Sequence, residues 1–195
     1  MISIQQVMGV CWIIFLVYWF ISAQSVKSTQ ETRGWLGGNW YPILYLIGAL
    51  FMINFRFLGR LGIPTKTLAI VLLPPAALVN VVVVILLIVG LIIAIAARRT
   101  LAGNWSNAVA LKKDHELITT GLYQYVRHPI YTGMLLMFLG TALSLGTLGA
   151  FIGFLIILVG VLFKLKEEEA LMTEHFAEEY IPYKKRTKTL IPFLW

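Results

Sequence analysis

The chain has 195 residues, of which 59% are hydrophobic and 13% are charged, whereas a soluble domain carries about 25% charged residues. A soluble protein of this length cannot bury so much apolar surface, so the composition indicates one integral membrane domain covering residues 1–195. The net charge is +7, which in a membrane protein reflects Lys and Arg at the cytoplasmic edge. No soluble basic module is left over to bind nucleic acid.

Five apolar segments predict an all-α protein with about five transmembrane helices. Arg56, near the end of the second segment, can snorkel to the membrane surface. Pro74-Pro75 interrupts the long third segment, so we expect a kink or a helix restart there, with residues 76–97 able to span the bilayer alone. The five segments are residues 7–23, 40–58, 68–97, 131–145 and 149–165.

The fourth and fifth segments are joined by only Gly146-Thr147-Leu148. No charged residue lies between Arg127 and Lys164, so these two segments predict a C-terminal helical hairpin. Gly149 and Gly153 form a small-xxx-small pair. The pair either brings two helices into close contact or is tolerated in the helix without a packing role.

Two polar stretches, residues 98–128 and 164–195, flank this hairpin and must therefore lie on the same side of the membrane. They hold 11 of the 16 Lys and Arg residues, which predicts that this side and the C-terminus are cytoplasmic. Arg56, Arg60 and Lys66 fall on the other side and disagree with the rule. Because the two ends of a hairpin are neighbours, residues about 35 positions apart can share one cytoplasmic pocket.

The polar stretches carry His, Arg, Tyr and a run of carboxylates from Glu167 to Glu169. Taken singly, these side chains suit interfacial anchors or a solvated helix turn. A metal site built from His115 and His128 with Glu167 or Glu168 is an alternative. The chain has no G-x-S-x-G or G-x-G-x-x-G motif, which argues against a serine hydrolase and a dinucleotide-binding domain.

The run His-Glu-Leu-Ile, Gly-Leu-Tyr, Arg-His-Pro-Ile-Tyr-x-Gly, then Glu-Glu before a tail with Phe176, Glu179-Tyr180 and Tyr183, resembles the isoprenylcysteine carboxyl methyltransferase family. The resemblance covers about residues 103–192, which would form the cofactor-binding region of a catalytic core at 67–195. Residues 1–66 would then form N-terminal helices without diagnostic residues.

The resemblance implies that S-adenosylmethionine binds between the two polar stretches and that no metal is used. It implies catalytic roles for Arg127 and Glu168, with Lys164 placed near the substrate. Arg127 is predicted to partner a carboxylate of the cofactor or the substrate. The positions implied to bind the cofactor are His115, Glu116, Leu117, Ile118, Tyr123, His128, Pro129, Ile130, Tyr131 and Glu168.

Methyl transfer from a sulfonium is chemically suited to such a site. The donor is already activated, so the protein has to align two reactants and exclude water. The predicted partners are the bilayer and a lipophilic acceptor, with a prenylcysteine-type carboxylate favoured and a phospholipid amine or small thiol as alternatives. An NADPH-dependent enzyme resembling sterol reductases and a non-catalytic membrane protein are alternatives of other classes. The membrane would be the cytoplasmic one in a prokaryote and the endoplasmic reticulum in a eukaryote.

The polar tail has its own pattern. Leu171, Phe176, Tyr180 and Tyr183 recur at roughly helical spacing, which predicts an interfacial amphipathic helix ending near Pro182.

Overall fold

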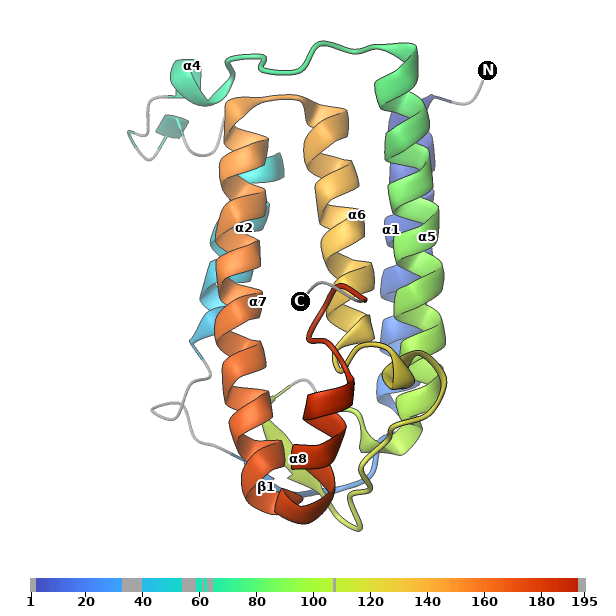
Figure 1. The fold of residues 1–195 in the computed structure, drawn as a ribbon. Helices are drawn as coiled ribbons and strands as arrows, with labels where there is room; N and C mark the ends of the chain where they lie inside the picture. Colours follow the sequence, from blue (N-terminus) through green and yellow to red (C-terminus); the bar gives the residue numbers. More distant parts are fainter. Residues whose placement is uncertain are drawn as a thin grey trace.

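The computed structural model describes residues 3–32, 40–53, 59–60, 62, 65–106 and 108–192. Long helices run side by side, and loops and short elements close one end of the bundle (Figure 1). Three of the long helices have the length and apolar composition to cross a membrane, namely α1, α5 and α7, whereas α2 and α6 are shorter apolar helices. The mostly helical fold is therefore confirmed. The long elements are α1 (Ile4–Ala23), α2 (Tyr41–Ile53), α5 (Ala77–Leu101), α6 (Pro129–Leu145) and α7 (Leu148–His175).

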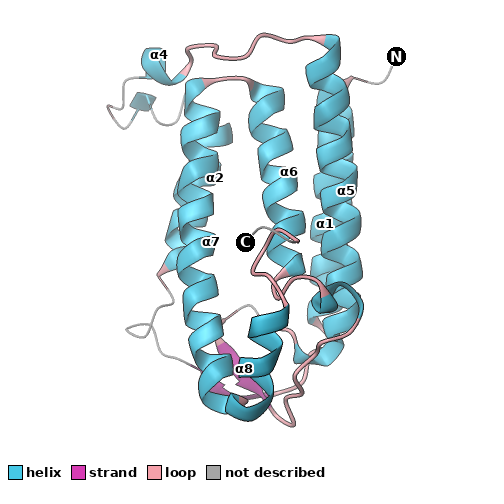
Figure 2. Ribbon diagram, in the orientation of Figure 1, coloured by secondary structure: helices cyan, strands magenta, loops and turns pink. Residues whose placement is uncertain are grey.

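The prediction of an all-α fold is wrong in one detail, because a two-stranded sheet lies at the closed end of the bundle (Figure 2). Thr29 pairs with Lys112 and Thr32 with Ala110 in antiparallel register. The sheet joins the segment after α1 to the polar loop after α5. The small elements are β1 (Thr29–Thr32), α4 (Thr65–Leu68), η2 (Ala102–Asn104), β2 (Ala110–Lys112), η3 (Gly121–Gln124) and α8 (Ala177–Arg186).

The helix restart predicted at Pro74-Pro75, within the third apolar segment of residues 68–97, is confirmed. Two consecutive prolines lack N–H groups for a helical ladder, and α5 starts only at Ala77, after an extended Ala76. Upstream of the prolines, the N–H groups of Leu72 and Leu73 donate to the carbonyl of Gly146 at 2.8 and 3.0 Å. The end of the predicted second segment, residues 54–58 with Arg56, lies outside the described residues.

The predicted hairpin is confirmed as α6 and α7. Pro129 occupies the first turn of α6, where its missing N–H costs nothing, and Gly146 ends the helix in the left-handed region at φ 63°. The Thr147 hydroxyl then accepts the N–H of Ala150 at 3.3 Å and caps α7. α7 continues past the predicted end at residue 165 to His175.

Each helix of the hairpin packs most closely on an earlier helix, α6 on α5 and α7 on α2. Glycines face each other at both contacts. A Cβ atom on Gly133 would lie 2.5 Å from the carbonyl oxygen of Gly90, and one on Gly153 would lie 2.5 Å from that of Gly48. Gly153 therefore permits close packing, with α2 as its partner.

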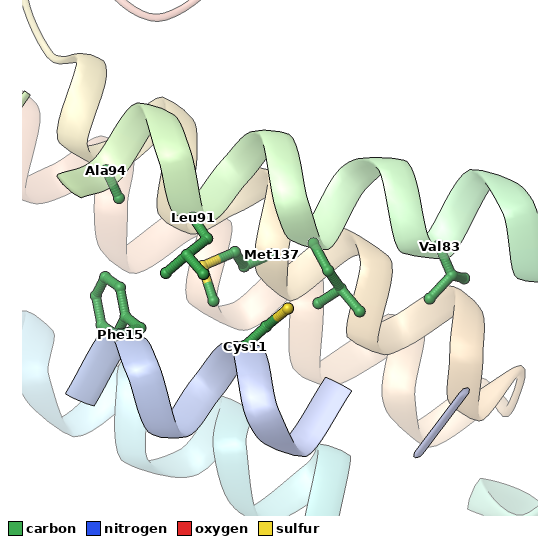
Figure 3. Close-up of a cluster of buried hydrophobic side chains, with 7 residues drawn as sticks. Cys11, Phe15, Val83, Leu91, Ala94 and Met137 are labelled. Carbon is green, nitrogen blue, oxygen red and sulfur yellow. The ribbon is translucent and has the colours of Figure 1, made fainter. Parts of the chain in front are cut away.

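A buried apolar cluster joins α1, α5 and α6 (Figure 3). Cys11 and Phe15 of α1 lie against Val83 and Leu91 of α5, with Met137 of α6 fully buried beside them. The thiol of Cys11 thus serves packing, and the N-terminal helix is part of the same bundle as the later ones.

The predicted end of the tail helix near Pro182 is wrong, because Pro182 lies inside α8 and the helix runs to Arg186. Tertiary contacts compensate for the hydrogen bond that the proline removes: Tyr180 and Tyr183 are buried, and the Tyr183 hydroxyl donates to the carbonyl of Tyr123 at 2.7 Å. After α8 the chain turns back beside the start of α6, where the N–H of His128 donates to the carbonyl of Thr189 at 3.1 Å (Figure 1).

Candidate active site

A cavity lies where the polar loop after α5, the last turns of α7 and α8 meet. Its empty volume is about 840 Å³, including the solvent at its open mouth. The two polar stretches that flank the hairpin in sequence are therefore brought together in space, as predicted. The predicted site residues among its walls are His115, Glu116, Leu117, Ile118, Tyr123, Arg127, His128, Ile130, Tyr131 and Glu168.

Glu168 is the central carboxylate of the hairpin. The Tyr131 hydroxyl of α6 donates to its Oε1 at 2.8 Å, although the two residues are 37 positions apart. Lys164, one turn earlier on α7, places its Nζ 3.7 Å from the same oxygen. That ammonium group is buried and lies 5.2 Å from the ring of Tyr41 and 5.5 Å from the ring of Tyr131. A cation and aromatic faces are thus held beside Glu168, the carboxylate that lines the cavity.

His128 stands directly before α6 and faces both glutamates of α7. Its Nδ1 lies 3.6 Å from Oε2 of Glu168, and its Nε2 lies 3.4 Å from Oε1 of Glu169. The second contact lacks hydrogen-bond geometry, so Nε2 is a buried nitrogen without a hydrogen bond among the described residues. Nε2 thus faces the carboxylate of Glu169, which does not line the cavity, whereas Nδ1 faces Glu168, which does.

Arg127 has acceptors from the protein at all three guanidinium nitrogens. Nε donates to Oε1 of Glu169 at 2.8 Å, and Nη2 lies 2.7 Å from the same oxygen and donates to the Thr189 hydroxyl at 2.9 Å. Nη1 donates to the carbonyl groups of Thr187 and Lys184 at 2.7 and 3.3 Å. Arg127 was predicted to pair with a carboxylate of the cofactor or the substrate, whereas in the structure its carboxylate partner is Glu169 of α7 and its other acceptors belong to the tail.

His115 also lines the cavity, on the loop after β2. The N–H of Lys112 donates to its Nδ1 at 3.2 Å, which leaves the ring proton on Nε2. Burial, together with the nearby charges of His175, Lys27 and Lys112, lowers the pKa of His115 to about 4. The imidazole is therefore neutral at pH 7.

Lys27 was not predicted as part of the site, yet it holds this loop in place. Its Nζ donates to Oδ1 of Asn104 at 3.0 Å and to the carbonyl of Asp114 at 2.6 Å. Asn104 lines the cavity, and its Oδ1 also accepts the N–H of Glu116 at 3.4 Å. One side chain from the segment after α1 thus connects both ends of the loop.

Aromatic rings form much of the remaining wall. The guanidinium of Arg98 lies over the ring of Trp105, with 4.6 Å between its Cζ and the ring centroid. The rings of Trp105 and Trp19 meet edge to face, with 5.5 Å between their centroids. Tyr123 is buried, and burial raises the pKa of its hydroxyl, so it remains a neutral phenol. Flat apolar faces of this kind suit a planar heterocycle.

Two predicted residues do not line the cavity: Pro129, which is buried at the start of α6, and Lys164, which is buried beside Glu168. Sequence reasoning did not assign other wall residues to the site. Leu171, Tyr180 and Tyr183 were assigned only to the tail helix, and the polar and aromatic residues of the loop after α5 had no pattern to single them out. The residues missed are Leu101, Asn104, Trp105, Ser106, Ala108, Ala110, Leu171, Met172, Tyr180 and Tyr183.

No three His, Cys, Asp or Glu side chains converge as metal ligands within the described parts of the chain. The residues do fit a nucleoside carrying a positive centre. Glu116 and Glu168 offer carboxylates to a cation. The two basic groups beside them add little positive charge, because His115 is neutral and the guanidinium of Arg127 is paired with Glu169. The fold and this site together define a mostly helical membrane protein with a polar cavity at one end of its bundle.

Comparisons with known proteins identify the family. Residues 78–179, more than half of the chain, match the model of the phospholipid methyltransferase family, and the chain belongs to that family. It is similar to the protein-S-isoprenylcysteine O-methyltransferase of Schizosaccharomyces pombe, with 36% identity over 94 residues, 47% of this chain and 40% of that protein. The protein of the same name from Homo sapiens is 33% identical over 102 residues, 51% of this chain and 36% of that protein.

The fold is similar to the solved structure of a eukaryotic intramembrane Ras methyltransferase, an isoprenylcysteine carboxyl methyltransferase. The TM-score is 0.54 at 25% identity, over 80% of this chain and 54% of that one. The resemblance predicted from the motifs is thus confirmed, and the chain is an integral membrane protein. The matched regions span less than half the length of these curated relatives.

Proposed function

We propose that this chain transfers a methyl group from S-adenosylmethionine to the carboxylate of a lipophilic, prenylcysteine-type acceptor. The observation that carries the proposal is the contact of Tyr131 and Lys164 with Glu168 at the wall of a cavity that opens at the end of an apolar bundle. A water-soluble charged cofactor and a membrane-borne acceptor can meet only at such a place.

The cavity walls would hold the cofactor. When bound, S-adenosylmethionine supplies a methyl group already activated on a sulfonium sulfur. Glu168 and Glu116 favour its net positive charge, and the faces of Tyr123 and Tyr131 suit the adenine or the sulfonium. His128 lines the cavity and places its Nδ1 3.6 Å from Oε2 of Glu168. In this proposal Arg127 positions the tail through its protein acceptors rather than by touching a ligand.

The chemistry is an in-line displacement. An oxygen of the acceptor carboxylate forms a bond to the methyl carbon, the carbon–sulfur bond breaks, and its electron pair stays on sulfur. The products are a methyl ester and a neutral thioether, and no proton has to move. The protein therefore acts by alignment, charge placement and exclusion of water.

Lys164 favours a carboxylate over an amine as the acceptor. Its buried ammonium group attracts an anionic acceptor, whereas methylation of an amine would add a second cation beside it. The family model, described as phospholipid methyltransferase, supports amine methylation as a second candidate, with a small thiol as a further alternative.

We further propose that α1, α2, α5, α6 and α7 each cross the membrane, with the cavity and α8 on the cytoplasmic side. The basic residues at the cavity end, such as Arg99, Lys113 and Lys185, suit this orientation. The membrane would be the cytoplasmic membrane of a prokaryote or the endoplasmic reticulum of a eukaryote.

The test is transfer of an isotope-labelled methyl group by the purified protein in lipid nanodiscs. Three acceptors are compared: an N-acylated S-prenylcysteine, phosphatidylethanolamine and a short alkyl thiol, with the prenylcysteine amide as the matched control. The proposal expects a base-labile methyl ester on the prenylcysteine and none on its amide. Equal or greater labelling of phosphatidylethanolamine would contradict the acceptor class, and tighter binding of NADPH than of S-adenosylmethionine would contradict the proposal as a whole.

Two lysine variants sharpen the acceptor test. Lys164→Met is expected to lower transfer to the prenylcysteine at least about tenfold, because a charge interaction in a buried site is lost. Lys166→Met, half a turn away on the exposed face, is the control and is expected to match the unmodified protein. Equal transfer rates for the two variants would contradict a role of Lys164 in binding the acceptor.

A further inference from the structure

Tyr180 of α8, which its spacing assigned only to the tail helix, is also a cavity residue. It lines the cavity and is only 2% exposed. Its hydroxyl has no hydrogen-bond partner among the residues that the structure describes. A buried hydroxyl without a partner is uncommon, because its hydrogen bonds to water are lost on burial and no protein group replaces them.

Two other tyrosine hydroxyls of the cavity wall donate hydrogen bonds within the protein. Tyr131 donates to Glu168 at 2.8 Å, and Tyr183, one turn after Tyr180, donates to the carbonyl of Tyr123 at 2.7 Å. Burial raises the pKa of Tyr180, so its hydroxyl keeps its proton and is a donor at neutral pH. The cavity wall on α8 thus holds one donor that the protein itself does not use.

Tyr180 is also held in place. Arg127 donates to the carbonyl groups of Lys184 and Thr187, at the end of α8 and directly after it, and the bond from Tyr183 attaches the middle of the helix to η3. The ring of Tyr180 lies 5.8 Å from that of Tyr183. With the helix attached at these points, a shift of α8 that carried the hydroxyl out to solvent would break several buried hydrogen bonds.

We propose that Tyr180 is a ligand-contacting residue, whose hydroxyl donates a hydrogen bond to an acceptor atom of the nucleoside cofactor bound in the cavity. Arg127 and Glu169 are the positioning residues that hold α8, and with it this hydroxyl, against the site. The inference rests on the proposed function, because it takes the cavity ligand to be S-adenosylmethionine. It makes the tail part of the binding site.

The experiment compares Tyr180→Phe with the unmodified protein in two measurements. The first is the unfolding temperature without ligand, which is expected to stay equal or rise, because the substitution removes an unpartnered buried hydroxyl and keeps the ring. The second is the affinity for S-adenosylmethionine and for S-adenosylhomocysteine by calorimetry, which is expected to fall about three- to tenfold. Tyr125→Phe, on an exposed ring outside the cavity, is the matched control and is expected to change neither.

Loss of affinity with unchanged or higher stability supports the inference, because a merely structural hydroxyl would not separate the two measurements. Unchanged affinity of Tyr180→Phe, with normal binding by the unmodified protein, overturns the inference and leaves the proposed function standing. A parallel loss of stability and affinity overturns it as well, since the hydroxyl would then serve the fold. If the unmodified protein binds neither nucleoside, both the proposed function and this inference fail.

Discussion

Arg127 and Glu169 join the two ends of the hairpin through a contact in which Nε donates to Oε1 at 2.8 Å, with side chains only 6% and 13% exposed. Lys184 of α8 places its Nζ 2.6 Å from the other oxygen of the same carboxylate. One glutamate therefore connects the loop before α6, the end of α7 and the tail. The adjacent Glu168 faces the cavity instead. Two neighbouring carboxylates on one helix therefore have different partners.

Replacement of either partner should release the tail. Glu169→Gln leaves the guanidinium of Arg127 without its counter-charge, and we expect a loss of about 3 kcal/mol in the free energy of unfolding. Limited proteolysis should then cut within residues 177–192 faster than in the unmodified protein. The double variant Arg127→Gln, Glu169→Gln should cost clearly less than the sum of the single changes. Additive costs would show that the two side chains act independently.

The contact of Lys27 with the cavity loop gives a second prediction. Lys27→Met keeps the apolar stem and removes the donors to Asn104 and to the carbonyl of Asp114. We expect a stability loss of about 2 kcal/mol and weaker binding of S-adenosylhomocysteine, since the loop loses both attachments. The exposed Lys113→Met is the control. Identical calorimetric titrations for the two variants would argue against a role of the N-terminal segment in the site.

His115 should make stability depend on pH. Its pKa is about 4 in the folded protein, below the ordinary 6.5, so between these values the unfolded chain binds more protons. The neutral ring therefore contributes stability above pH 6.5 that is lost as the pH falls towards 4, on the order of 3 kcal/mol for the full shift. In His115→Gln the fall in unfolding temperature over this range should be shallower. Parallel curves for the variant and the unmodified protein would refute the assignment.

Gly153 gives a prediction about the fold. A methyl group there would lie 2.5 Å from the carbonyl oxygen of Gly48 and 2.7 Å from Cγ of Met52, so Gly153→Ala should force α7 away from α2. We expect a cost of about 2 kcal/mol or more, measured by thermal unfolding in detergent. Gly9→Ala in α1 is the control, because nothing lies within 4 Å of the added atom, and it should be neutral or slightly stabilising. Similar effects of the two changes would contradict the close packing.

The sequence was sufficient to predict the hairpin and half of the residues that line the cavity. The uncharged run between Arg127 and Lys164 requires two helices with adjacent ends, and the motif residues next to those ends then have to meet. The contact of Tyr131 with Glu168 is the direct result. These features follow from local composition and hairpin length, which sequence reasoning reads well.

Which side chains and strands contact each other could not be predicted in the same way. Glu167, Glu168 and Glu169 are alike in sequence, and only the rotation of α7 turns one towards the cavity and the next towards Arg127. Lys27 and the strand Thr29–Thr32 pair with residues about 80 positions later, and a short polar segment carries no periodic pattern that would show it. Whether the tail helix ends at Pro182 or continues through it depends on the tertiary hydrogen bond of Tyr183, which the local sequence does not show.

The most direct test of the central claim is an experimental structure of the full chain in lipid nanodiscs with S-adenosylhomocysteine. The account predicts density for the nucleoside in the cavity bounded by His115, Tyr123 and Glu168, with Tyr180 within hydrogen-bond distance of it. Density for the nucleoside at another place, with this cavity filled by side chains or lipid, would contradict the account.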